Sequence, residues 1–288
     1  MSYRPGTLLS HLICLLSLSF SPCHSSSPLS TFPNPSVLSP TCLNTTCLSL
    51  SYLNTHIILL THHTGARFGP RSIRAASSRQ TPLRGYNPRA RINPYASWAR
   101  LLDCGDMPIT PFDNALALRQ MTTGYTELLS RPGLHHAHPR LVTLGGDHSL
   151  ALPALRGLSS IYGNGTITVV HFDAHLDTWS PFSYDSSWLD PSLDPEQQQS
   201  SFTHGSMFWL AWKEGLIARD GSNVHAGLRT RLTDEGDERS DGEQGWVRIA
   251  SDEVDNVGVQ GIVRRILEVV GREGPVSWWR VLWCGVCR

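Results

Sequence analysis

Two short clusters of aspartate and histidine could bind a metal ion. One is Asp173-Ala-His175-Leu-Asp177, and the other contains His148 within the run Gly145–Ser149. In an extended segment, residues at positions i, i+2 and i+4 project to the same side, so the side chains of Asp173, His175 and Asp177 can bind one metal ion together. A DxHxD triplet alone is equally typical of a polar loop that caps a helix. The presence of His148 favours the metal interpretation, because it adds a fourth potential ligand.

The donor atoms of these four residues indicate which metals they could hold. Carboxylate oxygens with imidazole nitrogens, and no thiolate nearby, suit Mn²⁺, Zn²⁺ or Fe²⁺ better than a structural zinc site built on cysteines. Two carboxylates on so short an arc suggest that one of them bridges two ions. A pair of ions roughly 3.5–4 Å apart can bind a water and lower its pKa, which supplies hydroxide near neutral pH.

Each cluster follows a run that is typical of a β-strand. Leu141–Leu144 precedes the first and Ile167–Phe172 the second, while Leu150–Tyr162 between them has the apolar spacing of a helix. A strand–helix–strand unit favours a parallel sheet. Ligands of open parallel sheets bind beyond the carboxyl ends of the strands, where both clusters lie. We therefore expect the four side chains to converge.

A further histidine could carry protons to and from such a site. His204 follows 180–201, a polar and turn-rich segment that could form the rim of the site or a surface insertion. A histidine beside a mobile loop suits a proton carrier that approaches a metal-bound water. The alternative is a histidine at the entry to a helix, which is predicted at Trp209–Ile217.

Several other elements are predicted from local patterns. Asp113–Leu129 has the pattern of a helix with Asp113 as its N-cap, and Asn223–Arg229 that of a short strand. The charged segment Arg231–Gly245 is predicted to be a loop, and Gly261–Val270 an amphipathic helix. Val276 should begin one more strand.

Length and charge limit the class of protein. A chain of 288 residues is long enough for one large α/β domain with a sizeable core. It has 24 basic and 24 acidic residues, and no basic patch indicates a nucleic-acid or membrane partner. Cys104 is the one cysteine between residues 65 and 276, so no disulfide framework is expected there, which is compatible with a reducing compartment.

The first 64 residues differ from the rest. No Asp, Glu, Lys or Arg occurs from Pro5 to Ala66. Leu8–Phe20 resembles the apolar core of a signal peptide and is too short for a comfortable membrane span. We interpret residues 1–64 as a low-complexity leader, disordered or non-native. Localisation is left open, because this leader is the one targeting signal; a cytoplasmic or organellar site is favoured over secretion.

Six motifs in order resemble those of the ureohydrolases, the arginase and agmatinase superfamily. They are GARFGPRSIR at 65–74, LDCGDMPITP at 102–111, GGDHS at 145–149, DAHLDTW at 173–179, THGSMF at 203–208 and HAGLRT at 225–230. The second and last look closest to the agmatinase branch. The resemblance covers residues 65–276. It implies an α/β fold with three layers, α/β/α, a mainly parallel sheet and a centre of two Mn²⁺ ions. The arginines of the first motif could bind an anion or pair with carboxylates, and we favour the pairing.

The resemblance also implies roles for particular residues. His148, Asp173, His175 and Asp177 match metal ligands, and His204 matches the histidine that shuttles protons. The family hydrolyses a guanidino compound to urea and an amine. In an agmatinase the substrate is agmatine and the product putrescine, a step of polyamine metabolism. Guanidinobutyrase-type and arginase-type activities stay open as alternatives. The family forms ring-like assemblies, so a homo-oligomer is expected.

Two departures from the family pattern affect these expectations. The third metal motif, SxDxDxxDP, and a later glutamate that receives the guanidinium do not follow Val276, so the fold is expected to be incomplete at its C-terminus. Asp173 and Asp177 are the remaining carboxylates, and two carboxylates cannot balance the charge of two dications. The site should therefore hold one ion weakly, or fail to hold the second ion at all. Loss of the later strands would leave an unpaired sheet edge and uncovered apolar helix faces, so the chain is expected to be poorly soluble and nearly inactive. A non-catalytic remnant is a third alternative.

The other departure concerns both ends of the chain. Ser2-Tyr-Arg-Pro-Gly6 resembles residues that in the family directly precede the ARFGP run, from which about 59 residues separate it here. We hypothesise that residues 7–64 and the aberrant tail 277–288 are translated intron. Transcript reads that join Gly6 directly to Gly65 or Ala66 would support this, and uniform coverage of 7–64 would contradict it.

Overall fold

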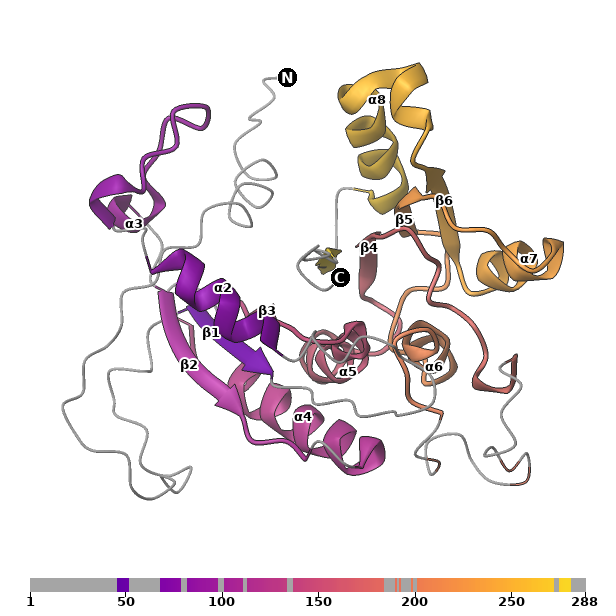
Figure 1. The fold of residues 1–288 in the computed structure, drawn as a ribbon, viewed down its shortest axis with the longest axis horizontal. Helices are drawn as coiled ribbons and strands as arrows, with labels where there is room; N and C mark the ends of the chain where they lie inside the picture. The colour runs from indigo at the N-terminus through magenta and orange to yellow at the C-terminus, as the bar shows by residue number, and fades with distance from the viewer. Residues whose placement is uncertain are drawn as a thin grey trace. The chain divides into compact units, whose positions relative to one another are not determined.

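The computed structural model of the chain contains parallel β-strands and α-helices in two compact units (Figure 1). The described residues are 46–51, 68–78, 82–97, 101–110, 113–133, 137–183, 190, 192, 198, 201–271 and 275–280, with the backbone alone in 46–51 and 277–280. Of these, 46–50, 68–106 and 128–144 belong to the first unit, and 51, 107–127 and those from 145 on to the second.

The first unit is built on a three-stranded sheet. Its order is β2-β1-β3, with β1 parallel to β3, and the strands are β1 (Thr46–Ser51), β2 (Leu101–Met107) and β3 (Val142–Leu144). Three short helices complete the unit: α2 (Gly69–Ser77), η4 (Pro82–Arg84) and α3 (Pro94–Ser97). Because β1 lies within residues 1–64 and the rest of that segment lies outside the described residues, the division into leader, domain and tail stays a prediction.

The arginine motif of the first unit makes ion pairs. Arg74 in α2 binds Asp103 through two parallel contacts, Nε to Oδ2 at 3.0 Å and Nη2 to Oδ1 at 3.1 Å, and reaches Asp106 at 2.8 Å. The predicted pairing of these arginines with carboxylates is therefore confirmed for Arg74. Cys104, between the two aspartates, is disulfide-bonded. The sequence analysis expected no disulfide framework between residues 65 and 276, and it did not foresee a disulfide at Cys104.

The second unit contains a parallel sheet of four strands in the order β6-β5-β4-β7. The strands are β4 (Thr168–Phe172), β5 (Asn223–Leu228), β6 (Trp246–Ala250) and β7 (Val276–Arg280). Every pairing in this sheet is parallel, and the register places His171 of β4 opposite His225 of β5. The predicted parallel sheet is confirmed, but it does not hold both strands of the predicted strand–helix–strand unit, because β4 lies in this sheet and β3 in the sheet of the first unit.

Side chains of β4 alternate between two faces of this sheet. Val170 belongs to an apolar cluster with Ile266 and Val270 of α8 (Glu253–Val270), and Phe172 packs against the same cluster. His171 points to the other face, where its ring meets the edge of Phe208 in α6 (Met207–Lys213). The second unit therefore has a helix–sheet–helix layering, as the sequence predicts.

The predicted helices around the sheet are largely confirmed. They are α4 (Asn114–Leu129), α5 (Ala151–Tyr162), α6 and the second half of α8. Asp113 caps α4, because its Oδ1 accepts the Leu116 N–H at 2.8 Å. α6 starts two residues before the predicted helix and ends at Lys213, since the chain then turns at Gly215, which has a φ of 71°.

The charged segment predicted as a loop contains a helix instead, α7 (Glu235–Glu243). Asp234 caps it by accepting a hydrogen bond from the Gly236 N–H. Three acidic residues in the first turn stabilise the helix, because they lie at the positive end of its dipole. The prediction failed because α7 has no apolar stripe, and its contacts to the rest of the unit are polar. β6, directly after it, was not predicted either.

α8 starts at Glu253, eight residues before the predicted helix. Gly258 has a φ of 65°, which interrupts the helical backbone there and explains why the pattern could be followed only from Gly261. Among the described residues, no helix has the length and apolar character needed to cross a membrane.

Candidate metal centre

The candidate ligands lie in the second unit, at the carboxyl end of β4 and at the start of a short helix. Asp173 and Asp177 follow β4 directly, and His148 opens η5 (His148–Leu150). Asp147 caps η5, because its Oδ1 accepts the Ser149 N–H at 3.0 Å. The cap fixes the backbone at the residue that carries the His148 imidazole.

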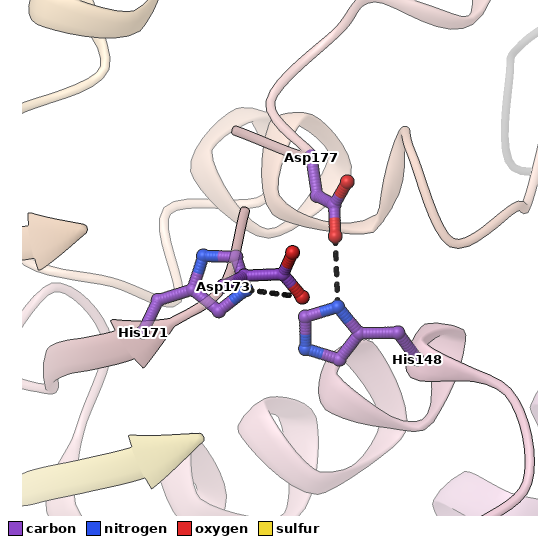
Figure 2. Close-up of side chains that lie close together, drawn as sticks. All are labelled: His148, His171, Asp173 and Asp177. Atoms are coloured by element: carbon purple, nitrogen blue, oxygen red, sulfur yellow. Dashed lines mark hydrogen bonds and ion pairs between the residues drawn. The ribbon is translucent and has the colours of Figure 1, made fainter. Parts of the chain in front are cut away.

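Four side chains converge here, as Figure 2 shows. One ligand atom from each of His148, His171, Asp173 and Asp177 lies within 4.8 Å of all the others. Nδ1 of His148 is 2.8 Å from Oδ2 of Asp177, and Nε2 of His171 is 3.7 Å from Oδ2 of Asp173. The His148 and His171 rings stack with their centroids 4.8 Å apart.

Two of the residues predicted from sequence take other positions. Nδ1 of His175 lies 3.1 Å from Oδ1 of Asp173, but the His175 side chain is 43 % exposed and lies outside the group of four. His204 is also partly exposed, with its Nδ1 4.0 Å from Oδ2 of Asp147. The structure thus brings three of the four predicted ligands together and leaves His175 at the exposed edge.

The sequence analysis missed His171. It stands two residues before Asp173, so the alternation that links Asp173, His175 and Asp177 extends back into β4 as HxDxHxD. Following that period one step further would have found it. It was passed over because it lies inside an apolar run, where a single histidine is usually part of the core.

The segment that carries the ligands is held from two sides. The backbone N–H groups of Arg229 and Thr230, which follow β5, both donate to the Ala174 carbonyl at 3.1 Å. From α7, Asp241 accepts the Thr178 hydroxyl at 2.8 Å and Asp237 accepts the Trp179 indole N–H at 3.1 Å. Arg229 and Thr230 belong to the HAGLRT motif, so the motif and α7 together position the ligand loop.

The two carboxylates are ionised although they are largely buried. Burial raises the pKa of Asp173, but the neighbouring His171 ring at 3.7 Å and the hydrogen bond from the His175 N–H outweigh it, so the net pKa lies below its ordinary value. Burial likewise raises the pKa of Asp177, and the hydrogen bond with His148 brings it below the usual range. Burial lowers the pKa of His171 to about 4, so its ring is neutral at pH 7.

This donor set fits a divalent cation. Two buried carboxylates carry two negative charges, which a single dication would balance. Oxygen and imidazole donors without thiolate suit Mn²⁺, Zn²⁺ or Fe²⁺. Nε2 of His171 is buried and makes no hydrogen bond, as expected of a nitrogen that a cation would occupy.

A parallel α/β sheet with aspartate and histidine ligands beyond its strand ends is the arrangement of a metal-binding α/β protein. A protein-family model described as "Arginase family" matches residues 58–278. The match spans more than half of the chain, and the chain therefore belongs to the arginase family, as the sequence motifs predict.

Individual relatives agree with this assignment. The chain is 38 % identical over 222 residues to "Putative agmatinase 1" of Schizosaccharomyces pombe, covering 73 % of this chain and 54 % of the relative. It is 32 % identical over 214 residues to an agmatinase of Neisseria meningitidis serogroup B, covering 72 % and 56 %. The chain thus spans about half the length of these curated relatives.

Solved structures give the same fold. A hypothetical agmatinase from Burkholderia thailandensis matches with a TM-score of 0.62 at 27 % identity, covering 82 % of this chain and 62 % of that one. Proclavaminate amidino hydrolase from Streptomyces clavuligerus matches with a TM-score of 0.62 at 26 % identity, covering 82 % and 68 %. The α/β fold with a parallel sheet is therefore that of this family.

Proposed function

We propose that this chain is a metal-dependent hydrolase of guanidino compounds, with agmatine as its substrate and putrescine and urea as its products. The observation that carries the proposal is the convergence of His148, Asp173 and Asp177 at the end of β4. Membership of the arginase family supports hydrolysis of a guanidino group, and the relatives named agmatinase support agmatine.

Manganese is the metal we propose, with His148, Asp173 and Asp177 as ligands and His175 as a ligand at the exposed edge. When bound, a divalent ion lowers the pKa of a coordinated water, so that hydroxide is available near neutral pH. The charge of the cluster favours one ion per chain, because its two carboxylates balance one dication. A second ion would leave a positive excess in a largely buried site.

His204 suits the role of a proton carrier. Its side chain is 39 % exposed, so it can exchange protons with water, and its ring lies near Asp147. The Gly205 carbonyl accepts the Trp179 N–H at 3.1 Å, which ties the loop of His204 to the ligand segment. A histidine that is open to solvent, on a loop tied to the segment that follows Asp177, can carry protons between the site and bulk water.

Urea release by the purified 288-residue chain tests the proposal. We expect Mn²⁺-dependent release that is faster from agmatine than from guanidinobutyrate or arginine, and slower than that of a family member that holds two ions, because the site holds one ion. A stoichiometry near one Mn²⁺ per chain should accompany it. Preference for another substrate would assign a sibling amidinohydrolase activity. A stoichiometry near zero with no urea would identify a non-catalytic chain.

A further inference from the structure

β5 carries an extra residue near its carboxyl end, beside the candidate metal centre. Ala226 pairs with Ile249 of β6. Two residues further on, Leu228 pairs with Ala250, the very next residue of β6. The extra residue is Gly227, whose φ is 98°. An insertion of this kind is a β-bulge, which bends its strand and changes the direction in which the following residues point.

The residues after the bulge turn toward the ligand segment. The backbone N–H groups of Arg229 and Thr230 both donate to the Ala174 carbonyl, each at 3.1 Å. Ala174 stands between Asp173 and His175 in the sequence. Two hydrogen bonds from the end of β5 therefore hold the peptide group in the middle of the segment that carries the candidate ligands.

The bulge has hydrogen bonds on both of its sides. The Arg229 side chain folds back on it, because Nη1 donates to the Gly227 carbonyl at 3.0 Å. After the bulge, the Leu228 carbonyl accepts the N–H of Ser251, the residue that follows β6, at 2.9 Å. With both sides held, the backbone of residues 229 and 230 leaves the sheet in one direction, toward Ala174.

The backbone conformation at position 227 explains why a glycine stands there. A Cβ at Gly227 would meet the Asp173 carbonyl oxygen at 3.5 Å, an ordinary contact distance, so a small side chain has room. A φ of 98° lies in the left-handed region, which residues with a side chain rarely adopt. A side chain here would favour a negative φ, which would turn the two N–H groups away from the Ala174 carbonyl.

We propose that Gly227 is a positioning residue for the metal centre. Its left-handed backbone directs two N–H groups onto the Ala174 carbonyl, which fixes the ligand segment between Asp173 and His175. The inference rests on the metal site of the proposed function and adds to it. Groups that hold metal ligands from behind typically contribute about 10–100-fold to metal affinity.

Mn²⁺ binding to the metal-free full-length chain tests this, with free Mn²⁺ followed by electron paramagnetic resonance. Gly227→Ala should weaken binding by at least about 10-fold, because the ligand segment loses its anchor. Gly227→Asn should weaken it less, because asparagine adopts a positive φ more readily than alanine. Asparagine is also the larger side chain, so the reverse order would show that size matters instead of φ, and the proposal would be wrong.

Gly221→Ala is the matched control. Gly221 lies just before the amino end of β5 and has a φ of 83°, so alanine meets a similar backbone restriction there. A Cβ at Gly221 would have no heavy atom within 4 Å among the residues that the structure describes. The two alanine variants should lower the midpoint of urea unfolding by similar amounts. Gly221→Ala should keep Mn²⁺ affinity within about two-fold, because it holds no part of the ligand segment.

Hydrogen exchange gives a second readout, which a general loss of stability would not reproduce. The amide hydrogens of Arg229 and Thr230 should lose protection in Gly227→Ala and keep it in Gly221→Ala, because only the first change frees them from Ala174. In the unchanged chain, Mn²⁺ should slow their exchange, since a contact that strengthens metal binding is strengthened by the metal in return.

The outcomes separate this inference from the proposed function. If the unchanged chain binds Mn²⁺ and Gly227→Ala binds it equally well, the inference is wrong and the metal site stands. If Gly221→Ala weakens binding as much as Gly227→Ala, the effect is general loosening and the positioning role is wrong. If Gly227→Ala does not fold, Gly227→Asn is compared with Gly221→Asn by the same criteria. If the unchanged chain binds no Mn²⁺, the proposed metal site fails and the inference fails with it.

Discussion

The candidate metal centre has two sides that are organised in different ways. The buried layer, made of His171, His225 and Asp241, is joined by hydrogen bonds of 2.7 and 3.1 Å and has no exposed surface. The rim is made of Asp147, His175 and His204. In the rim, His204 and Asp147 are 4.0 Å apart, and the two histidine side chains are 39 % and 43 % exposed.

The difference follows from the cost of leaving polar groups without partners. A buried imidazole or carboxylate without a hydrogen bond lowers the free energy of unfolding by roughly 1–3 kcal/mol, so the protein must supply a partner when it folds. An exposed group bonds to water and needs no fixed partner. The buried layer is therefore organised before a metal binds, whereas the rim is left free to respond to metal, water or substrate.

The largest expected effect tests whether the buried carboxylates are the ones that hold the metal. Asp177→Asn removes half of the negative charge of the cluster, from a residue that is 4 % exposed. We expect Mn²⁺ affinity to fall by more than about 100-fold, beyond the loss typical of residues behind the ligands. Calorimetric titration of the metal-free chain measures it.

Asp147→Asn in the rim is the matched control for that change. Asparagine caps a helix about as well as aspartate, so η5 keeps its first turn. Mn²⁺ affinity should stay within about three-fold of the unchanged chain, because Asp147 is outside the group of converging ligands. Equal losses in the two variants would remove the distinction between a buried binding side and an open rim.

A smaller effect, on turnover alone, is expected in the rim. His204→Asn removes the proposed proton carrier and should slow urea release from agmatine by about 100-fold at saturating Mn²⁺, the order typical of general acid–base groups. Mn²⁺ affinity should not change. Because His204 is partly exposed, added imidazole should restore part of the rate. A parallel loss of metal affinity would show instead that the rim helps to hold the metal.

The same contrast explains what the sequence could predict. The strand–helix–strand unit that ends in His148 and Asp173 was predicted correctly, because hydrophobic periodicity and the order of elements are local signals. The clusters converge as expected, but not for the predicted reason: β3 and β4 lie in different sheets, and His148 reaches the group from the start of η5. His175 was predicted at the same site, but its exposure depends on how the loop bends after Asp173, which spacing alone does not give.

The hydrogen bonds of the buried layer could not be predicted, since they join distant parts of the chain. His171 and His225 are 54 residues apart, and their pairing depends on the register of β4 against β5. Asp241 lies in α7, a helix that was missed because polar tertiary contacts, and not an apolar stripe, stabilise it. A polar network of this kind has no signature in hydrophobic periodicity, so only the assembled sheet reveals it.

The smallest expected effect concerns acid stability and tests the proton arrangement of the buried layer. The folded-state pKa of Asp241 is depressed, so its contribution to stability is present above the ordinary pKa of an aspartate and is lost as pH falls through the folded-state pKa. Asp241→Asn should therefore lower the free energy of unfolding by about 2 kcal/mol at pH 5, and by less at pH 3. Urea denaturation of the metal-free chain at both pH values measures the difference.

Asp220→Asn gives the comparison on the surface. Asp220 is exposed, and its pKa is lowered chiefly by the hydrogen bond from Ser222, so its replacement should change stability less at either pH. If Asp241→Asn cost the same at pH 3 and pH 5, Asp241 would not be ionised in the folded chain. A protonated Asp241 could donate to His225, which would reverse the direction of the hydrogen bond between the two side chains. A difference that narrows with acid therefore supports an ionised Asp241 that accepts a hydrogen bond from Nε2 of His225.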